Sequence, residues 1–155
     1  MATFFRRIYL ALTFIGNSFR SPLLLIIRLI WGWAFLRTGL GKLQNIDPII
    51  NFFHSLGIPM PALNAYIASG IEFVGGACLL IGLASRFITI PLVLTMCVAY
   101  LTAYPDAVTM LFTNPQLFVQ KDPFNFLFAA LLVFVFGPGS ISLDYWIEKK
   151  YSAST

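Results

Sequence analysis

Two charged residues, Arg28 and Glu72, stand inside long apolar segments of the sequence. A charge at the centre of a bilayer costs about 3 kcal/mol on insertion scales, so it normally faces the interior of a bundle and finds a partner there. Such residues can form an ion pair that fixes the register of two helices. They can equally contact a bound ligand, and the sequence leaves both interpretations open.

The residues near these charges suit the binding of a quinone. Arg28 and Lys42 can donate hydrogen bonds to its carbonyl oxygens, and Glu72 can exchange a proton. Small-molecule pockets combine such polar groups with apolar walls. The candidate wall residues are large, apolar or aromatic, and come from two segments: Trp31, Phe35, Met96 and Tyr100.

Other kinds of chemistry find little support in the sequence. There is one histidine, His54, and no Ser/His/Asp spacing, metal-ligand cluster or phosphate-binding glycine loop. Hydrolysis, phosphoryl transfer and a metal site are therefore not indicated. His54 lies in a short polar-flanked segment, where a solvated histidine is more common than a proton carrier or a ligand. Whether the chain is itself an enzyme stays open.

The elements that position these residues are expected to be membrane helices. Of the 155 residues, 59% are apolar and only 10% are charged, against about 25% charged residues in soluble domains. Spans need roughly 17 to 25 apolar residues, and four runs qualify, at about 22–43, 62–84, 87–104 and 123–141. The predicted fold class is all-α, an integral membrane four-helix bundle with short interfacial helices.

Cap and proline signals divide the chain further. Ser21 before Pro22, and Asp122 before Pro123, are typical of helix starts. Residues 1–21 are expected to form a separate amphipathic helix at the membrane interface, followed by the bundle over 22–142 and an interfacial tail over 143–155. A short surface helix is expected at 49–56, and the 105–122 connection is left without an assigned role.

The distribution of basic residues predicts the orientation. Six of them fall near span ends on one side and two or three on the other, so the positive-inside rule places both termini in the cytoplasm. The first side has Arg6, Arg7, Arg20, Arg86, Lys149 and Lys150. The other side has Lys42 and Lys121, and it has three basic residues if Arg37 is counted there. The basic residues are scattered without forming a patch, which argues against nucleic acid as a partner.

Helical wheels predict how the first two spans pack. Small and charged residues form one stripe on each span, and such stripes let helices approach closely. The stripes are Arg28, Gly32, Phe35, Gly39 and Lys42 on the first span, and Ala65, Ala68, Glu72, Gly75, Gly76, Leu79 and Arg86 on and after the second. Arg28 and Glu72 are expected to pair between them, whereas Arg37 falls on the opposite face.

The ordered motifs over about residues 24–145 resemble the DoxX family of small bacterial four-span membrane proteins. They are Arg28 with Gly39-Leu40-Gly41-Lys42, Phe52-Phe53, Gly57-Ile58-Pro59, Glu72-Phe73-Val74-Gly75-Gly76, Gly82-Leu83, Arg86, Gly137-Pro138-Gly139 and Ser142-Leu143-Asp144. The resemblance implies a multi-pass protein of the bacterial inner membrane that is tied to redox chemistry. A related DoxD-type subunit belongs to a thiosulfate:quinone oxidoreductase, and other members are linked to oxidative or thiol stress.

The leading hypothesis is a quinone- or quinol-interacting subunit of a membrane oxidoreductase or redox-stress system. Membrane lipids, a quinone and a soluble or membrane redox partner are then the expected partners. One alternative is a non-catalytic scaffold that anchors a soluble redox enzyme through its basic termini. Another is a small transporter that works as a homo-oligomer, because a single four-span bundle lacks the paired broken helices of secondary transporters.

Overall fold

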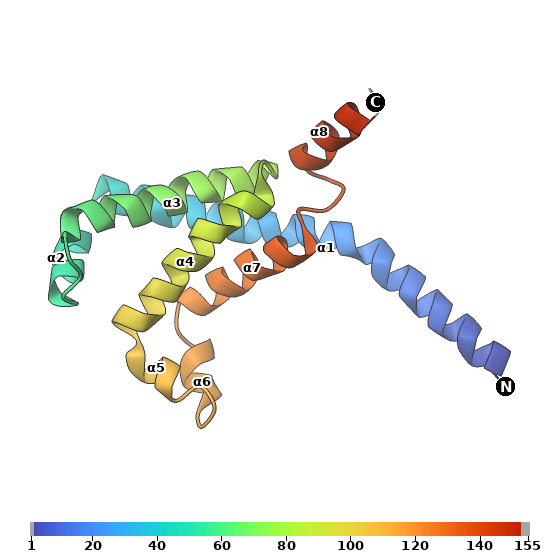
Figure 1. The fold of residues 1–155 in the computed structure, drawn as a ribbon, viewed down its shortest axis with the longest axis horizontal. Coiled ribbons are helices and arrows are strands. Elements are labelled where there is room, and N and C mark those ends of the chain that lie inside the picture. Colours follow the sequence, from blue (N-terminus) through green and yellow to red (C-terminus); the bar gives the residue numbers. More distant parts are fainter. Residues whose placement is uncertain (1, 153–155) are drawn as a thin grey trace.

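The computed structural model describes residues 2–152, and every regular element in that range is a helix (Figure 1). The long helices are α1 (Ala2–Gln44), α3 (Pro61–Ile81), α4 (Ser85–Ala103) and α7 (Pro123–Phe136). The shorter helices are α2 (Asp47–Ser55), α5 (Pro105–Thr109), α6 (Pro115–Val119) and α8 (Leu143–Ser152). The predicted all-α class is confirmed.

The four long helices pack into one bundle. The most extensive contacts join α1 to α3 and α4 to α7, and contacts of α3 with α4 and of α1 with α7 close the ring. Figure 1 shows α1 and α3 running side by side while α4 and α7 cross them obliquely. The core between them consists of buried apolar side chains from all four helices: Phe35, Leu79, Leu92, Met96, Ala130 and Val133.

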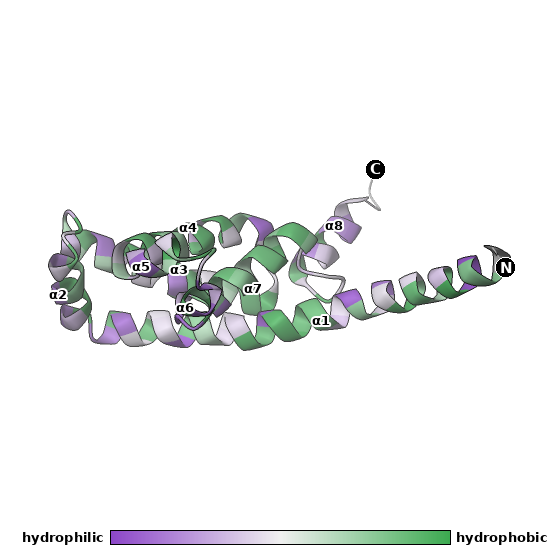
Figure 2. Ribbon diagram, turned by 90° about the horizontal axis from the view of Figure 1, so that it is seen from below, coloured by the Kyte–Doolittle hydropathy of each residue, from purple (hydrophilic) through white to green (hydrophobic). Residues whose placement is uncertain are grey.

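The outer surface of the bundle is apolar as well. Figure 2 shows that hydrophobic residues predominate along the helices of the bundle. Large side chains such as Leu94, Val98 and Leu101 on α4 are more than half exposed. A soluble monomer rarely exposes so much contiguous apolar surface. Phe4–Gln44 of α1, together with all of α3 and α4, is long and apolar enough to cross a membrane. The chain is therefore an integral membrane protein, as predicted.

The fourth predicted span, 123–141, is helical only as far as Phe136. Fourteen helical residues cover about 21 Å, less than the roughly 30 Å of a bilayer core. The helix ends because Gly137 takes a positive φ of 79° and Pro138 has no backbone N–H with which to continue it. Residues 137–142 follow as an irregular segment, and a crossing by the whole 123–141 region stays a prediction.

The N-terminal boundary also differs from the prediction. α1 runs without interruption through Pro22, because a proline inside a helix removes one backbone hydrogen bond and bends the helix without having to end it. Ser21 does not act as a cap; its hydroxyl instead accepts a hydrogen bond from the Ser140 N–H. Figures 1 and 2 show the first half of α1 projecting away from the bundle. Its position at a membrane interface stays a prediction.

The remaining boundaries agree closely with the sequence. Helices α3 and α4 begin and end within three residues of the expected spans, and a short helix, α2, fills the first connection. α7 starts at Pro123 as expected, although Asp122 makes no capping hydrogen bond. The 105–122 connection contains α5 and α6, and α8 forms in the predicted tail. Residues 153–155 of that tail lie outside the described residues.

The turn between α3 and α4 is held by the C-terminal segment. α3 ends at Gly82 with a φ of 72°, and Ala84 is also left-handed. The free N–H groups of Ala84 and Ser85 at the start of α4 donate to the carboxylate of Asp144, at 2.6 and 2.8 Å. An acidic side chain from α8 thus caps α4, where a negative charge is favourable.

Candidate functional site

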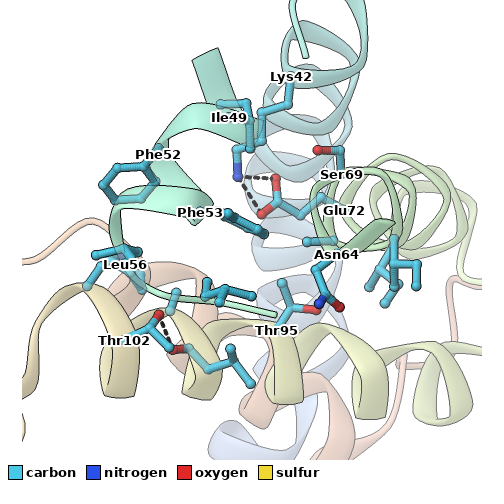
Figure 3. A pocket seen from close by; sticks show the side chains of 18 of the residues that line it. Lys42, Ile49, Phe52, Phe53, Leu56, Asn64, Ser69, Glu72, Thr95 and Thr102 are labelled. Atoms are coloured by element: carbon cyan, nitrogen blue, oxygen red, sulfur yellow. Dashed lines mark hydrogen bonds and ion pairs between the residues drawn. The ribbon is translucent and has the colours of Figure 1, made fainter. Parts of the chain in front are cut away.

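The Glu72 carboxylate forms an ion pair with Lys42. Lys42 lies in the last turn of α1 and Glu72 near the middle of α3, and the ammonium donates to both carboxylate oxygens at 2.6 and 2.7 Å. Glu72 is 3% exposed, whereas the Lys42 side chain is 32% exposed. The pair therefore links a buried carboxylate to a partly accessible cation, and Figure 3 shows the contact between the two side chains.

The expected pairing of Arg28 with Glu72 is wrong. The predicted stripes do pack against each other, but Gly39 on α1 lies against the backbone of Ser69 and Phe73 on α3. This register places Glu72 close to the level of Gly39, and Arg28 lies eleven residues away from Gly39 along α1, or about 16 Å. Lys42 is only three residues from Gly39 on the same face, so it reaches the carboxylate first.

Arg28 instead binds four backbone carbonyl oxygens. Its side chain is buried and donates to Leu79 at 2.9 Å, to Leu80 at 3.3 Å, to Pro138 at 2.7 Å and to Ile141 at 2.9 Å. Two of these carbonyls end α3 and two belong to the irregular segment after α7. Non-helical backbone at membrane depth requires partners inside the protein, and the Arg28 guanidinium supplies them.

A cavity of about 530 Å³ lies beside the Lys42–Glu72 pair, within the 300–1,000 Å³ range of small-molecule sites. Its walls come mainly from α2, α3 and α4 (Figure 3). The segments that connect the helices, the end of α1 and the start of α7 contribute the remaining lining residues. Most of the lining is apolar: Ile49, Phe52, Phe53, Leu56, Ile58, Ile67, Ala68, Ile71, Pro91, Leu94, Val98, Ala99, Ala103 and Pro123. Phe52, Ile67, Leu94 and Val98 are also exposed, so the cavity reaches the apolar outer surface.

Polar groups on the lining are few. Besides Lys42 and Glu72 they are Asn64, Ser69, Thr95, Thr102, Tyr104 and Asp122. Asn64 donates to the Pro59 carbonyl, and Thr95 and Thr102 donate to carbonyls one turn back in α4. The hydroxyl of Ser69 is buried and has no hydrogen-bond partner in the part of the chain that the structure describes. Among the lining residues that the structure describes, Lys42 and Glu72 form the one ion pair.

Of the predicted site residues, only Lys42 and Glu72 line this cavity. Trp31 and Phe35 each make an edge-to-face contact with Phe126 of α7. Met96 is buried in the bundle core. Tyr100 stacks on Phe118 and donates its hydroxyl to the Phe118 carbonyl at 2.8 Å. These four residues pack α1 and α4 against α7 and α6, and Arg28 binds backbone carbonyl oxygens. The structure therefore does not bring the predicted ligand-binding residues together at one site.

The cavity residues at α2 were not among those predicted from the sequence. Ile49, Phe52, Phe53 and Leu56 follow the i, i+3, i+4, i+7 spacing of one helix face. None of them is buried, although all four line the cavity. That spacing was the available signal, because an apolar face on a short surface helix must cover something. His54, on the same helix, is exposed and does not line the cavity.

The Lys42–Glu72 contact predicts energetic coupling. Lys42→Met should lower the free energy of unfolding by roughly 2 to 3 kcal/mol, because it leaves a buried carboxylate without its cation. The double variant Lys42→Met with Glu72→Gln should be milder than the sum of the single variants. Chemical unfolding in detergent micelles measures all three. An Arg28–Glu72 cycle is the control and should be additive; coupling there, with none for Lys42, would contradict the observed pairing.

Comparisons with known proteins find a family model and several relatives to which this sequence is similar. The sequence model of the DoxX family matches residues 23–105. A Bacillus subtilis protein named "Putative oxidoreductase CatD" is 37% identical over 78 residues, which are 50% of this chain and 57% of that protein. "Inner membrane protein YphA" of Escherichia coli is 29% identical over 126 residues, 81% of this chain and 90% of that protein. No solved structure matches.

Proposed function

The chain belongs to the DoxX family of membrane proteins, and we propose that it binds a quinone or quinol in the cavity beside Lys42 and Glu72, as a subunit of a membrane oxidoreductase system. The observation that carries the proposal is a buried ion pair at the side of an apolar cavity whose walls reach the lipid-facing surface. A quinone is lipid-soluble and would enter from the bilayer. Its ring needs apolar walls, and its carbonyl oxygens need a few donors.

The chemistry of the polar groups fits this ligand. Lys42 offers a donor to a carbonyl oxygen, and Glu72 is a proton acceptor at the same place. Oxidation of a quinol releases two electrons and two protons. Glu72 would accept one of the protons, and the two electrons with the second proton would pass to a redox partner protein. The name of the Bacillus subtilis relative is in keeping with a redox role.

A cavity-filling variant tests the proposal. Ala99 lines the cavity on α4, so Ala99→Phe should occupy the space for the ring and weaken binding of a short-chain ubiquinone more than tenfold. The matched control is Leu101→Phe, at an exposed position on the same helix that does not line the cavity. Calorimetry on protein in detergent measures both affinities. A folded wild-type protein that binds no quinone would reject the proposal.

The scaffold function is a second candidate with its own observation. Helix α8 has no buried residue, carries Lys149 and Lys150 in its last turn, and projects from the bundle at the same end as the N-terminal half of α1 (Figures 1 and 2). Together with Arg6 and Arg7 of α1, these lysines give the two terminal segments a basic excess, which suits an acidic soluble redox enzyme. Copurification of that enzyme, lost on Lys149→Glu with Lys150→Glu, together with an absence of quinone binding would favour this function.

A further inference from the structure

We propose that Ser69 is a ligand-contacting residue, whose hydroxyl holds, together with the Lys42 ammonium, one carbonyl oxygen of a neutral ring ligand. The inference rests on the proposed function and deepens it, because it names the donor pair and the chemical class of the group that is bound. It starts from the buried Ser69 hydroxyl, which has no partner among the described residues of the chain.

The Ser69 side chain is fully buried and lines the cavity, and its hydroxyl makes no hydrogen bond with any of residues 2–152. Native proteins keep few such groups, because each one costs free energy unless something binds it. Hydroxyls in helices usually donate to a carbonyl one turn back. Thr38, Thr95 and Thr102 all do so in this protein, and Ser69 does not.

The position of Ser69 puts its hydroxyl at the polar part of the cavity. Residues 69 and 72 are three apart on α3 and therefore share a face. Figure 3 shows the Ser69 hydroxyl directed to the side on which the Lys42–Glu72 pair lies. The Lys42 ammonium has three N–H groups, and its contacts within residues 2–152 are with the two oxygens of Glu72. One N–H is left for a ligand.

These groups select the kind of ligand. A carbonyl oxygen has two lone pairs, so it can accept one hydrogen bond from Ser69 and one from Lys42. The ion pair is neutral overall, which favours a neutral acceptor: an anionic head group would be repelled by Glu72, and a cationic one would compete with Lys42. The apolar lining contributed by Phe53, Ala68 and Ala99 accommodates the rest of a ring compound.

A pair of serine variants tests this assignment. Ser69→Ala should weaken binding of a short-chain ubiquinone about fivefold to tenfold, the factor expected for one hydrogen bond. The ligand-free protein should be no less stable, because the hydroxyl has no protein partner to lose. Ser85 is the matched control: its hydroxyl is equally buried and unpartnered, but it does not line the cavity. Ser85→Ala should leave the affinity unchanged.

The outcomes separate this inference from the proposed function. If wild-type protein binds the quinone and Ser69→Ala binds it equally well, the Ser69 assignment is overturned and the proposed function stands. A loss of stability in ligand-free Ser69→Ala would show that the hydroxyl has a structural role, which also overturns the assignment. If folded wild-type protein binds no ubiquinone, both proposals fall together.

Discussion

Replacing Arg28 by glutamine is expected to lower the free energy of unfolding by about 3 kcal/mol or more, the largest effect of any single polar substitution in this chain. The guanidinium is 1% exposed and binds carbonyl oxygens of α3 and of the segment after α7. A buried carbonyl left without a donor costs about 1 to 3 kcal/mol, and a glutamine amide cannot reach four of them.

Unfolding in detergent micelles, followed by circular dichroism, measures this loss. Arg37→Gln is the control, because Arg37 is an exposed arginine on the same helix. This variant should change the free energy of unfolding by less than about 0.5 kcal/mol. Arg28→Lys should fall between the two, since lysine keeps the charge but has fewer donors in a different geometry. Equal stability of the Arg28 and Arg37 variants would contradict the role assigned to Arg28.

The sequence predicted the helices well because their signals are local. Apolar runs, prolines and glycines mark where α2, α3 and α4 begin and end, and the periodicity of small residues identified the faces on which α1 and α3 meet. The residue that pairs with Glu72 could not be predicted from local sequence signals. Arg28 and Lys42 lie on the same face of α1 at different depths, and only the axial register of α1 against α3 decides which of them reaches the carboxylate.

The candidate cavity was harder to predict for a similar reason. Its walls come from α2, α3 and α4. The spacing on α2 indicates an apolar face, but it does not indicate which part of the bundle that face packs against. Aromatic residues on the bundle helices were the obvious candidates for ligand contact. Phe35 and Tyr100 turned out to pack helices together, because large aromatic side chains in a small bundle are first needed to fill its core.

The second large effect is expected at Gly39, where the register of α1 and α3 is set by direct backbone contact. A Cβ at Gly39 would overlap the backbone of Phe73 and lie 2.8 Å from the carbonyl oxygen of Ser69. Backbone cannot move aside as a flexible side chain can, so Gly39→Ala must push the helices apart and should lower the free energy of unfolding by about 3 kcal/mol.

Gly41 provides the matched control for this variant. It lies two residues along the same helix, and a Cβ there would meet nothing within 4 Å. Gly41→Ala should therefore stabilise the protein by about 0.5 to 1 kcal/mol, through helix propensity alone.

Because Gly39 contacts the turn of α3 that carries Ser69, separation of the helices should also draw Glu72 away from Lys42. Gly39→Ala is then expected to weaken quinone binding in the fraction that remains folded, whereas Gly41→Ala leaves it unchanged. If both glycine variants were equally stable, close backbone contact could not be what sets the register of the ion pair.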